Sequence, residues 1–517
     1  MTQMEIPATP VAGAAPAWRK QVDAQGWRTL AEQLAAAGTR FGALWASDDR
    51  ERGGAFTLRA LYVVYEGLLV AELPVDAAHA TYPDLSDLFA CTARMQRAVF
   101  DGHGLRALTP AGDVPDPRPW LRHGAWPADV HPLRREHALA ERHAPSDDRY
   151  AFVPVDGEGV HEIPVGPVHA GTIEPGHFRF SVVGERVLRL EQHLGYKHKG
   201  IEKRFESMTL EEGARLAGRV SGDTTVAYAW AYAMAVEGMS GVTPPARALW
   251  LRALMLERER VANHLGDLGY LGNDGGLAFG LAQFGRLKEE TLRTNASVFG
   301  HRYLMDRVLP GGVSTDVDDP AAELMLDEAD RIEREVRLLR EIYEDHAGLQ
   351  DRFVACGELS PQLAAKLGVV GFAARASGIA IDARAHPGLA PYPELSPAIA
   401  CRRSGDVAAR AQVRFEEALD SLRLQRRILR RLPQDGIRAT VQQPAPGAFG
   451  LGWVEGWRGE VFIALEAGED GAIRRCHPHD PSWQVWPALE HAIIGNIVPD
   501  FPLINKSFNL SYAGADL

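Results

Sequence analysis

The sequence predicts an α+β protein in which a small N-terminal α/β module precedes a large, mainly helical domain with peripheral β-hairpins. Its 517 residues are too many for one ordinary domain and favour two to four. Before residue 160 the pattern consists of short apolar runs of strand length around a single helical repeat. Beyond residue 240 several stretches of about 20 residues place apolar side chains at helical spacing, which is typical of a helix bundle.

The overall composition excludes several classes of protein. A net charge of −12 disfavours a general affinity for nucleic acid or for an anionic membrane surface. The four cysteines are scattered, so we expect a reducing compartment rather than a disulfide framework. The N-terminal residues lack the pattern of a secretory signal, and no run reaches the roughly 18 apolar residues that span a bilayer. We therefore expect no nucleic-acid partner and no direct membrane insertion.

Changes in composition divide the chain into segments. The first 25 residues are rich in Ala and Pro. The sequence after residue 105 is rich in Pro, Asp, His and Arg and shows little hydrophobic periodicity. We expect four segments: a flexible N-terminal arm over 1–25, an α/β module over 26–140, a linker over 141–160 and a large domain over 161–517.

Two elements are predicted inside the N-terminal module. Residues 58–75 form two apolar runs broken at Glu66-Gly67, which indicates a pair of strands. Residues 84–105 then carry helical spacing through Leu88, Met95 and Val99.

The large domain is predicted to begin with a β-hairpin. Over 177–195, Phe178 and Phe180 alternate with polar residues before a turn at Gly184-Glu185. Apolar stripes then predict long helices, the first directly after Pro244-Pro245, which favours a helix start. The predicted helices cover 247–269, 327–345 and 407–432, and a second β element with a turn at 469–471 is predicted over 459–480.

Eight motifs carry a resemblance to known proteins. The longest are GPVHAGTIEPGHFR at 166–179 and GYKHKGIEK at 195–203, and the others are TPPARA, ERERVANHL, GGV, ARASG, GDVAAR and VEGWRGE. In this order they resemble the large subunit of membrane-bound NiFe hydrogenases of the formate hydrogenlyase and hydrogenase-4 type, and the related 49-kDa-type subunit of complex I. Residues 82–136, which end in HPLRRE, resemble the 30-kDa-type subunit of complex I. The resemblance implies a hydrogenase/complex I large-subunit-like fold over 161–517 with the smaller module fused ahead of it.

The chain departs from the hydrogenases at the metal ligands. Those enzymes hold nickel and iron with two CxxC pairs, and neither pair is present here. The first pair falls at Ser221 and Thr224 in GRVSGDTTVAYAW, which would line the vacated cavity. An ungapped placement puts the second pair at Asp500 and Leu503. Because nickel and low-spin iron need soft thiolates, we expect no NiFe centre and no metal ligands in this chain.

The resemblance implies roles for four further residues. Glu174 in IEPGH matches the glutamate that passes protons from the hydrogenase metal site. Arg458 in EGWRG matches the arginine whose guanidinium lies over the metals. His169 in GPVHAG and Asp274 in GNDGG match residues that hold a quinone headgroup in complex I. We expect this chain to bind no cofactor of its own, and a quinone or another small redox carrier in the vacated cavity is kept as an alternative.

Each of these residues also has a simpler structural interpretation. The alternatives are solvation for Glu174, a hairpin cap or tie for His169, a turn for Asp274, and an ion pair with a carboxylate such as Glu455 for Arg458. For Ser221 and Thr224 the alternative is helix packing or local hydrogen bonding to the backbone. Lys199, Glu202 and Lys203 in GYKHKGIEK are expected to dock a neighbouring subunit.

The favoured interpretation is a hydrogenase-like large subunit of a membrane-associated, energy-converting redox complex, without a NiFe centre of its own. The resemblance implies a small iron–sulfur subunit as obligatory partner, its iron–sulfur cluster facing the cavity, and antiporter-like membrane subunits that complete the complex. The chain would then lie in the cytoplasm on the inner face of the cell membrane, held there by its partners. Two alternatives stay open: a catalytically silent scaffold, and a quinone-binding subunit of an NADH dehydrogenase-like complex.

Overall fold

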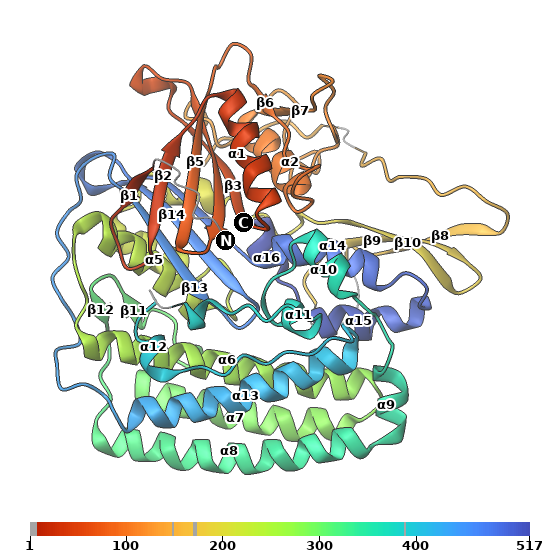
Figure 1. The fold of residues 1–517 in the computed structure, drawn as a ribbon, viewed down its shortest axis with the longest axis vertical. Helices are drawn as coiled ribbons and strands as arrows, with labels where there is room; N and C mark the ends of the chain where they lie inside the picture. Colours follow the sequence, from red (N-terminus) through yellow and green to blue (C-terminus); the bar gives the residue numbers. More distant parts are fainter. Residues whose placement is uncertain (1–7, 147–148, 169–172, 387–388) are drawn as a thin grey trace.

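The computed structural model describes residues 8–146, 149–168, 173–386 and 389–517. A five-stranded sheet with two helices lies at one end of the molecule, and a layer of long helices lies at the other (Figure 1). A second sheet lies between them, and a slender three-stranded sheet projects from one side. The predicted α+β fold class is confirmed.

The N-terminal sheet contains the first five strands of the described residues. They are β1 (Thr9–Val11), β2 (Ala17–Gln21), β3 (Arg40–Asp48), β4 (Phe56–Val64) and β5 (Gly67–Val75), in the order β1-β2-β5-β4-β3. Only β2 and β5 run parallel, and the other neighbours are antiparallel. The strand pair predicted over 58–75 is confirmed as β4 and β5. The flexible arm predicted over 1–25 is wrong for its described part, because β1 and β2 pair within this sheet.

Two helices, α1 (Ala24–Ala36) and α2 (Thr92–His103), cover one face of this sheet (Figure 1). The side chain of Asp23 caps α1 by accepting a hydrogen bond from the backbone N–H of Gly26 at 2.7 Å. The helix predicted over 84–105 begins only at Thr92. Asp84 is held in a turn instead, where it accepts hydrogen bonds from the Ser86 N–H at 2.9 Å and the Gln96 amide at 2.7 Å.

Both faces of the N-terminal sheet are buried. Phe41 and Tyr62 pack with α1 and α2, whereas Trp45 and Leu61 pack into the core of the large domain. A strand that is buried on both sides reads as a continuous apolar run rather than as an alternation. The two modules therefore share one core, and neither is an independent globule joined by a tether.

The connection between the modules is mostly irregular. A short parallel pair, β6 (Thr81–Pro83) and β7 (Arg106–Leu108), precedes it. Within the predicted linker over 141–160, the ring of Tyr150 stacks on His193 with 3.9 Å between centroids, and the Val153 N–H donates to Glu191 at 2.8 Å. The described part of this segment thus lies against the large domain.

The sheet that projects from the side contains the predicted hairpin. Its strands are β8 (Val160–Val165), β9 (His177–Val183) and β10 (Arg186–His193), in the order β10-β9-β8 (Figure 1). The hairpin predicted over 177–195 is confirmed, with its turn at Gly184-Glu185 between β9 and β10.

Long helices form the opposite end of the molecule. The three predicted helices are confirmed as α6 (Ala246–Asp274), α8 (Asp319–Asp345) and α13 (Val407–Leu429). Two more, α5 (Thr225–Ser240) and α7 (Ala278–Phe299), were not predicted. The shorter elements are α3 (Ile201–Phe205), α4 (Leu210–Ala217), β11 (Val308–Leu309), β12 (Gly312–Val313), α9 (Ala347–Phe353), α10 (Pro361–Leu367), α11 (Gly371–Ala376), α12 (Tyr392–Leu395), α14 (Ser482–Ala492), α15 (Phe501–Phe508) and α16 (Tyr512–Asp516).

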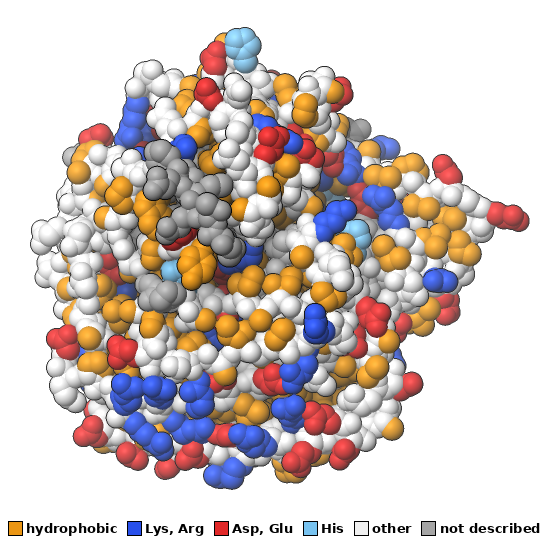
Figure 2. Space-filling view, viewed as in Figure 1, with side chains coloured by type: hydrophobic (Ala, Val, Ile, Leu, Met, Phe, Trp, Pro, Cys, Tyr) orange, Lys and Arg blue, Asp and Glu red, His pale blue; other side chains and the backbone are white. Residues whose placement is uncertain are grey.

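The outer surface of the long-helix layer is solvated. Figure 2 shows Lys and Arg side chains gathered over this end of the molecule, with Asp and Glu side chains beside them. Among the described residues, none of the helices combines the length and the apolar character that a membrane span requires.

The central sheet packs closely against α5. It consists of β13 (Phe449–Glu455), β14 (Glu460–Ala467) and β15 (Ile473–His479), and the β element predicted over 459–480 is confirmed as β14 and β15. Gly450 and Gly452 face the helix, and a Cβ at either would overlap a carbonyl oxygen of α5, that of Ala235 or of Ala231. Helix and strand therefore meet backbone to backbone.

This close approach predicts that Gly452→Ala lowers the free energy of unfolding by about 2–3 kcal/mol, because an added methyl group has no space and the carbonyl cannot move alone. The matched control is Gly285→Ala on α7, where a Cβ meets open space. Since alanine favours a helix over glycine by about 0.5–1 kcal/mol, the control should be neutral or stabilising. Denaturant unfolding of both variants checks this, and equal stabilities would contradict it.

Candidate functional site

The centre of the candidate site is an ion pair between Arg458 and Asp223. Arg458 lies in the turn between β13 and β14, and Asp223 lies in the turn before α5. The guanidinium donates to both carboxylate oxygens, at 2.8 and 2.6 Å, and to the hydroxyl of Thr224 at 3.1 Å. Its Nε donates to the carbonyl oxygen of Asn509 at 2.6 Å. Only 5% of the Arg458 side chain is exposed. The predicted ion pair with a carboxylate is present, but its partner is Asp223 and not Glu455, which binds Arg375.

The charge of Arg458 decides the protonation of its partner. Burial alone would raise the pKa of the Asp223 carboxyl. The charge and hydrogen bonds of Arg458, with bonds from Ser221 and Thr224, outweigh burial and hold that pKa well below its usual range. Asp223 is therefore ionised at neutral pH.

Ser511, and neither Asp500 nor Leu503, contacts Ser221, where the first ligand was expected. Ser511 belongs to the C-terminal segment, residues 509–517, which follows α15. The hydroxyl oxygens of Ser221 and Ser511 lie 2.9 Å apart. Asp500 instead lies near Arg352, and the Leu503 side chain is buried in α15. The ungapped placement of the second pair is thus corrected.

Gly514 follows Ser511 with the spacing of a CxxC pair. Its N–H donates to the Ser511 hydroxyl at 2.9 Å, and a Cβ at 514 would overlap the carboxylate of Asp480. The buried Asp480 accepts a hydrogen bond from the Tyr228 hydroxyl at 2.7 Å. Ser221, Thr224, Ser511 and Gly514 thus lie together, and the carboxylates of Asp223 and Asp480 and the guanidinium of Arg458 surround them.

The same C-terminal segment reaches Glu174. A carboxylate oxygen of Glu174 accepts a hydrogen bond from the backbone N–H of Ala513 at 3.0 Å, and its other oxygen lies 3.6 Å from the ammonium of Lys197. With 37% of its side chain exposed, Glu174 connects the site to solvent. The structure thus brings Glu174 to the same helix, α16, that follows Ser511.

Sequence reasoning missed a second carboxyl group at this place, Asp516. It is 1% exposed and accepts a hydrogen bond from the Lys197 N–H at 2.9 Å. Burial raises the pKa of Asp516 to about 7, and the backbone N–H groups that it binds oppose this only in part. Nothing in the local sequence distinguishes this residue, because its burial results from contacts across more than 300 positions of the chain.

Glu259 on α6 was also missed. Its carboxylate accepts hydrogen bonds from the N–H groups of Val226 and Ala227 at the start of α5, at 2.7 and 3.3 Å. Burial raises the pKa of Glu259 to about 8, with a further contribution from the charge of Asp223. A hollow of about 10 Å³ between Asp223 and Glu259 has room for about one water.

Of the two residues that match the complex I quinone site, only Asp274 lies in the described part of the chain. His169 lies outside the described residues. Asp274 ends α6, where burial raises its pKa, and the Asn273 amide donates to it at 3.4 Å. The α6 carboxylate that contacts the C-terminal segment is Asp267, which accepts a hydrogen bond from the Asn509 amide at 2.7 Å.

The residues expected to dock a partner subunit bind within the chain. The ammonium of Lys199 donates to the carbonyl oxygen of Val220 at 2.8 Å. Lys203 lies 2.9 Å from Glu206, and Glu202 lies 2.6 Å from the guanidinium of Arg475. The docking prediction is corrected for Glu202, because its carboxylate is nearly buried against β15.

Comparisons with known proteins agree with this architecture. Residues 275–448 match the family described as the 49 Kd subunit of respiratory-chain NADH dehydrogenase, and residues 20–143 match its 30 Kd subunit. Formate hydrogenlyase subunit 5 of Escherichia coli (strain K12) is 30% identical over 92% of this chain and 84% of its own length. Hydrogenase-4 component G of the same organism is 30% identical over 92% and 83%.

A solved structure is similar over most of the chain. It belongs to the membrane-bound sulfane sulfur reductase, an archaeal respiratory membrane complex. The TM-score is 0.65 at 25% sequence identity, over 71% of this chain and 100% of that chain. The resemblance inferred from the eight motifs is confirmed.

The raised pKa of Asp516 predicts a pH-dependent stability. Because the folded state holds this proton more tightly than the unfolded chain, whose carboxyl has a pKa near 3.8, the contribution of Asp516 is present below about pH 4 and is lost as the pH rises to about 7. Asp516→Asn removes this titration, so the variant should be more stable than the parent at pH 8. Between pH 4 and pH 8, the free energy of unfolding of the variant should rise relative to that of the parent by on the order of 2–4 kcal/mol. Unfolding measurements at both pH values test this, and parallel pH profiles would contradict it.

Proposed function

Since this chain belongs to the family of large subunits of complex I-like membrane-bound hydrogenases, in which a 30-kDa-type module precedes a 49-kDa-type module, we propose that it is the proton-transferring large subunit of a membrane-associated redox complex and holds no NiFe centre. Its relatives are hydrogenase and respiratory-complex subunits, so the complex couples electron transfer to energy conversion.

The donor set at the site is the observation that carries this proposal. Nickel and low-spin iron are held by soft, ionised thiolates. Here the corresponding positions are three hydroxyl groups and a glycine, and the space at Gly514 is taken by the Asp480 carboxylate. These residues do not fit a NiFe centre, and the proposed function assigns no step to one.

The carboxyl groups of Glu174 and Asp516 are suited to transferring protons. Glu174 is partly exposed to solvent, while Asp516, the last residue of the helix α16 that Glu174 contacts, is buried and has a pKa of about 7. A group with a pKa near the working pH gives up and regains a proton most readily. Lys197 contacts both carboxyl groups, through its ammonium and its backbone N–H. A proton would pass from solvent through Glu174 and Asp516 towards the Arg458 cluster.

The electron partner in this proposal is a small iron–sulfur subunit seated over the cluster. Antiporter-like membrane subunits would use the coupled energy, and the chain would lie on the cytoplasmic face of the cell membrane through these partners. The similarity to a chain of an archaeal respiratory membrane complex supports this placement.

One observation favours the scaffold alternative. Arg458 and Asp223 satisfy each other's charges, and further hydrogen bonds from Thr224 and Asn509 complete the cluster without a ligand. A quinone is less well supported, since sites for such ligands measure roughly 300–1,000 Å³ and the hollow beside Asp223 has about 10 Å³. The two interpretations, a scaffold and a proton-transferring subunit, can be distinguished by variants that change only the protonation of a side chain.

The donor set predicts that the purified complex contains far less than one nickel per copy of this chain and neither consumes nor evolves hydrogen. Elemental analysis and a hydrogen-uptake assay, with the formate hydrogenlyase large subunit prepared in parallel as a positive control, check this. About one nickel for each chain would contradict the central claim.

The proton route predicts that Glu174→Gln leaves folding and assembly intact but abolishes the coupled activity, because an amide cannot exchange protons. Arg458→Lys should reduce activity less, since the positive charge persists while the fork that binds Asp223 is lost. The control is Glu185→Gln in the exposed turn of the hairpin.

Complementation of a deletion strain by each variant, with assembly followed on native gels, is the measurement. Full activity with Glu174→Gln would leave the scaffold as the better account.

A further inference from the structure

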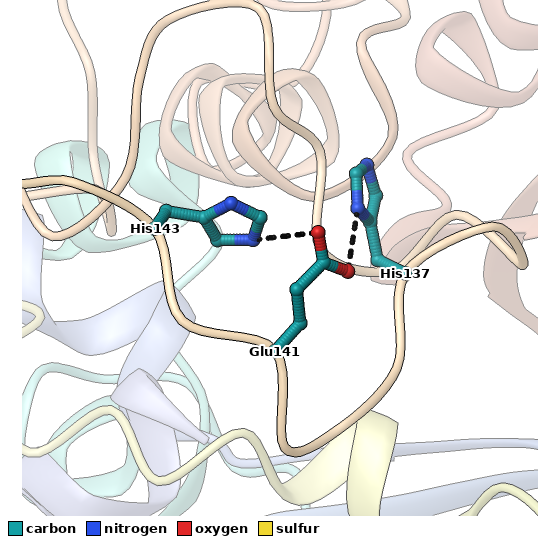
Figure 3. A group of neighbouring side chains, drawn as sticks. All are labelled: His137, Glu141 and His143. Atoms are coloured by element: carbon teal, nitrogen blue, oxygen red, sulfur yellow. Dashed lines mark hydrogen bonds and ion pairs between the residues drawn. The ribbon is translucent and has the colours of Figure 1, made fainter.

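A group of metal-ligating side chains lies outside the site described above. His137, Glu141 and His143 belong to the irregular segment that connects the two modules. Figure 3 shows the Glu141 carboxylate between the two imidazole rings. One oxygen lies 3.0 Å from Nδ1 of His137, and the other lies 3.8 Å from Nε2 of His143.

The three side chains are close enough to share one ion. One ligand atom from each lies within 4.8 Å of the other two. In a tetrahedral zinc site, bonds of about 2.0–2.1 Å place ligand atoms roughly 3.3 Å apart, so a modest closure of the side chains completes the geometry. The rings of His137 and His143 are nearly perpendicular, at 84°, with 5.5 Å between their centroids, so they do not stack on each other.

The surrounding backbone holds the group in place. The His137 N–H donates to the carbonyl oxygen of Arg134 at 3.2 Å, and the Glu141 N–H donates to that of Ala138 at 3.0 Å. A Glu141 oxygen also accepts a hydrogen bond from the Ala138 N–H at 3.2 Å. Two of the three ligands are thus placed by the turn before any ion binds, which lowers the entropic cost of binding.

The segment is anchored to both modules. The N–H of Arg135 donates to Asp48 of β3 at 3.0 Å, and its guanidinium donates to the carbonyl oxygen of Arg474 on β15 at 2.6 Å. The neighbouring Arg134 donates to the carbonyl oxygen of His103 at 2.8 Å. The proposed ligands lie three to nine residues after Arg134. An ion bound there would fix the start of the linker close to the place where the two modules meet.

Burial differs among the ligands in a way that suits a metal. The imidazoles are 18% and 17% exposed, whereas the Glu141 side chain is 37% exposed. Partly buried imidazoles lose little hydration on binding, and the exposed side leaves a coordination position for water. Two histidines and one glutamate form a ligand set that is typical of zinc with an open fourth position.

We propose that His137, Glu141 and His143 bind a first-row divalent transition metal ion, with Zn²⁺ the best match, and that this ion fastens the inter-module segment. The two imidazole nitrogens select Zn²⁺, Co²⁺ or Ni²⁺ over Mg²⁺ or Ca²⁺, which favour oxygen ligands. This site is independent of the Arg458 cluster and of the proposed proton transfer.

The test is a metal titration of the full-length chain after treatment with a chelator. Isothermal titration calorimetry with Zn²⁺ should show one site per chain, with an affinity at least tenfold above that of any other site. Titration with Co²⁺ should give the visible absorption of a tetrahedral ion. Bound Zn²⁺ should also raise the thermal midpoint, because it binds the folded state only.

Variants of the ligands make the test specific. His143→Ala and Glu141→Gln should each weaken that site at least tenfold and remove the rise in the thermal midpoint. Glu141→Gln retains an oxygen for the Ala138 N–H, so it also serves where His143→Ala disturbs folding. The matched control is His79→Ala, because His79 pairs with Asp76 at 2.9 Å on the surface of the N-terminal module.

The control variant should bind as the parent does. A parent chain without a distinct Zn²⁺ site, or His143→Ala and Glu141→Gln chains that bind Zn²⁺ as the parent does, would overturn the proposal.

Discussion

The nearly buried guanidinium of Arg458 is the constraint on which the candidate site depends. A buried charge that is left unpaired is strongly destabilising, so the chain has to supply acceptors on every side of it. Asp223 supplies a carboxylate from the start of α5, and Asn509 supplies a carbonyl oxygen from the C-terminal segment. The ring of Trp457 lies 4.0 Å from the guanidinium carbon and covers one of its faces. The turn after β13, the start of α5 and the C-terminal segment are therefore positioned by one charge.

A second layer of buried charges lies beneath that turn. Glu455, three residues before Arg458, accepts a hydrogen bond from Arg375 at 2.9 Å, and Arg375 also donates to Glu417 of α13 at 2.6 Å. Arg384 binds Asp382 in the same region, at 2.7 Å. Such networks contribute little net stability compared with apolar packing, because each charge loses its hydration. Their effect is on geometry: because each partner must be matched, they fix the direction in which the β13–β14 turn presents Arg458.

How much of the fold follows from the sequence depends on which faces of an element are exposed. The long helices α6, α8 and α13 and the β9–β10 hairpin keep enough polar side chains for their period to be visible. Helix α5 is buried almost all round, so it shows no stripe. Strands β1 and β2 are short and lie in a sequence rich in Ala and Pro, which does not predict strands. They are strands because β2 pairs with β5 and β1 pairs with β2.

Some residues of the candidate site could be predicted from the sequence, and others could not. Ser221, Thr224, Glu174 and Arg458 stand in motifs that can be matched without a structure, and the first and last of these indeed meet around Asp223. Ser511 was missed, because the ungapped placement put the second pair at Asp500 and Leu503 instead. Asp516 and Glu259 carry no motif at all, since what sets them apart is burial by segments distant in the sequence.

The carboxyl groups of the site differ in a way that assigns their roles. Asp223 is held ionised by Arg458, whereas burial raises the pKa of Asp516 to about 7 and that of Glu259 to about 8. When environments separate the pKa values of neighbouring acids, the group near neutrality carries the proton and the ionised group stabilises charge. In a hydrogenase that stabilising field would act on metals. In the function proposed above, the same guanidinium and carboxylate would act on a proton, on water or on a partner's redox centre.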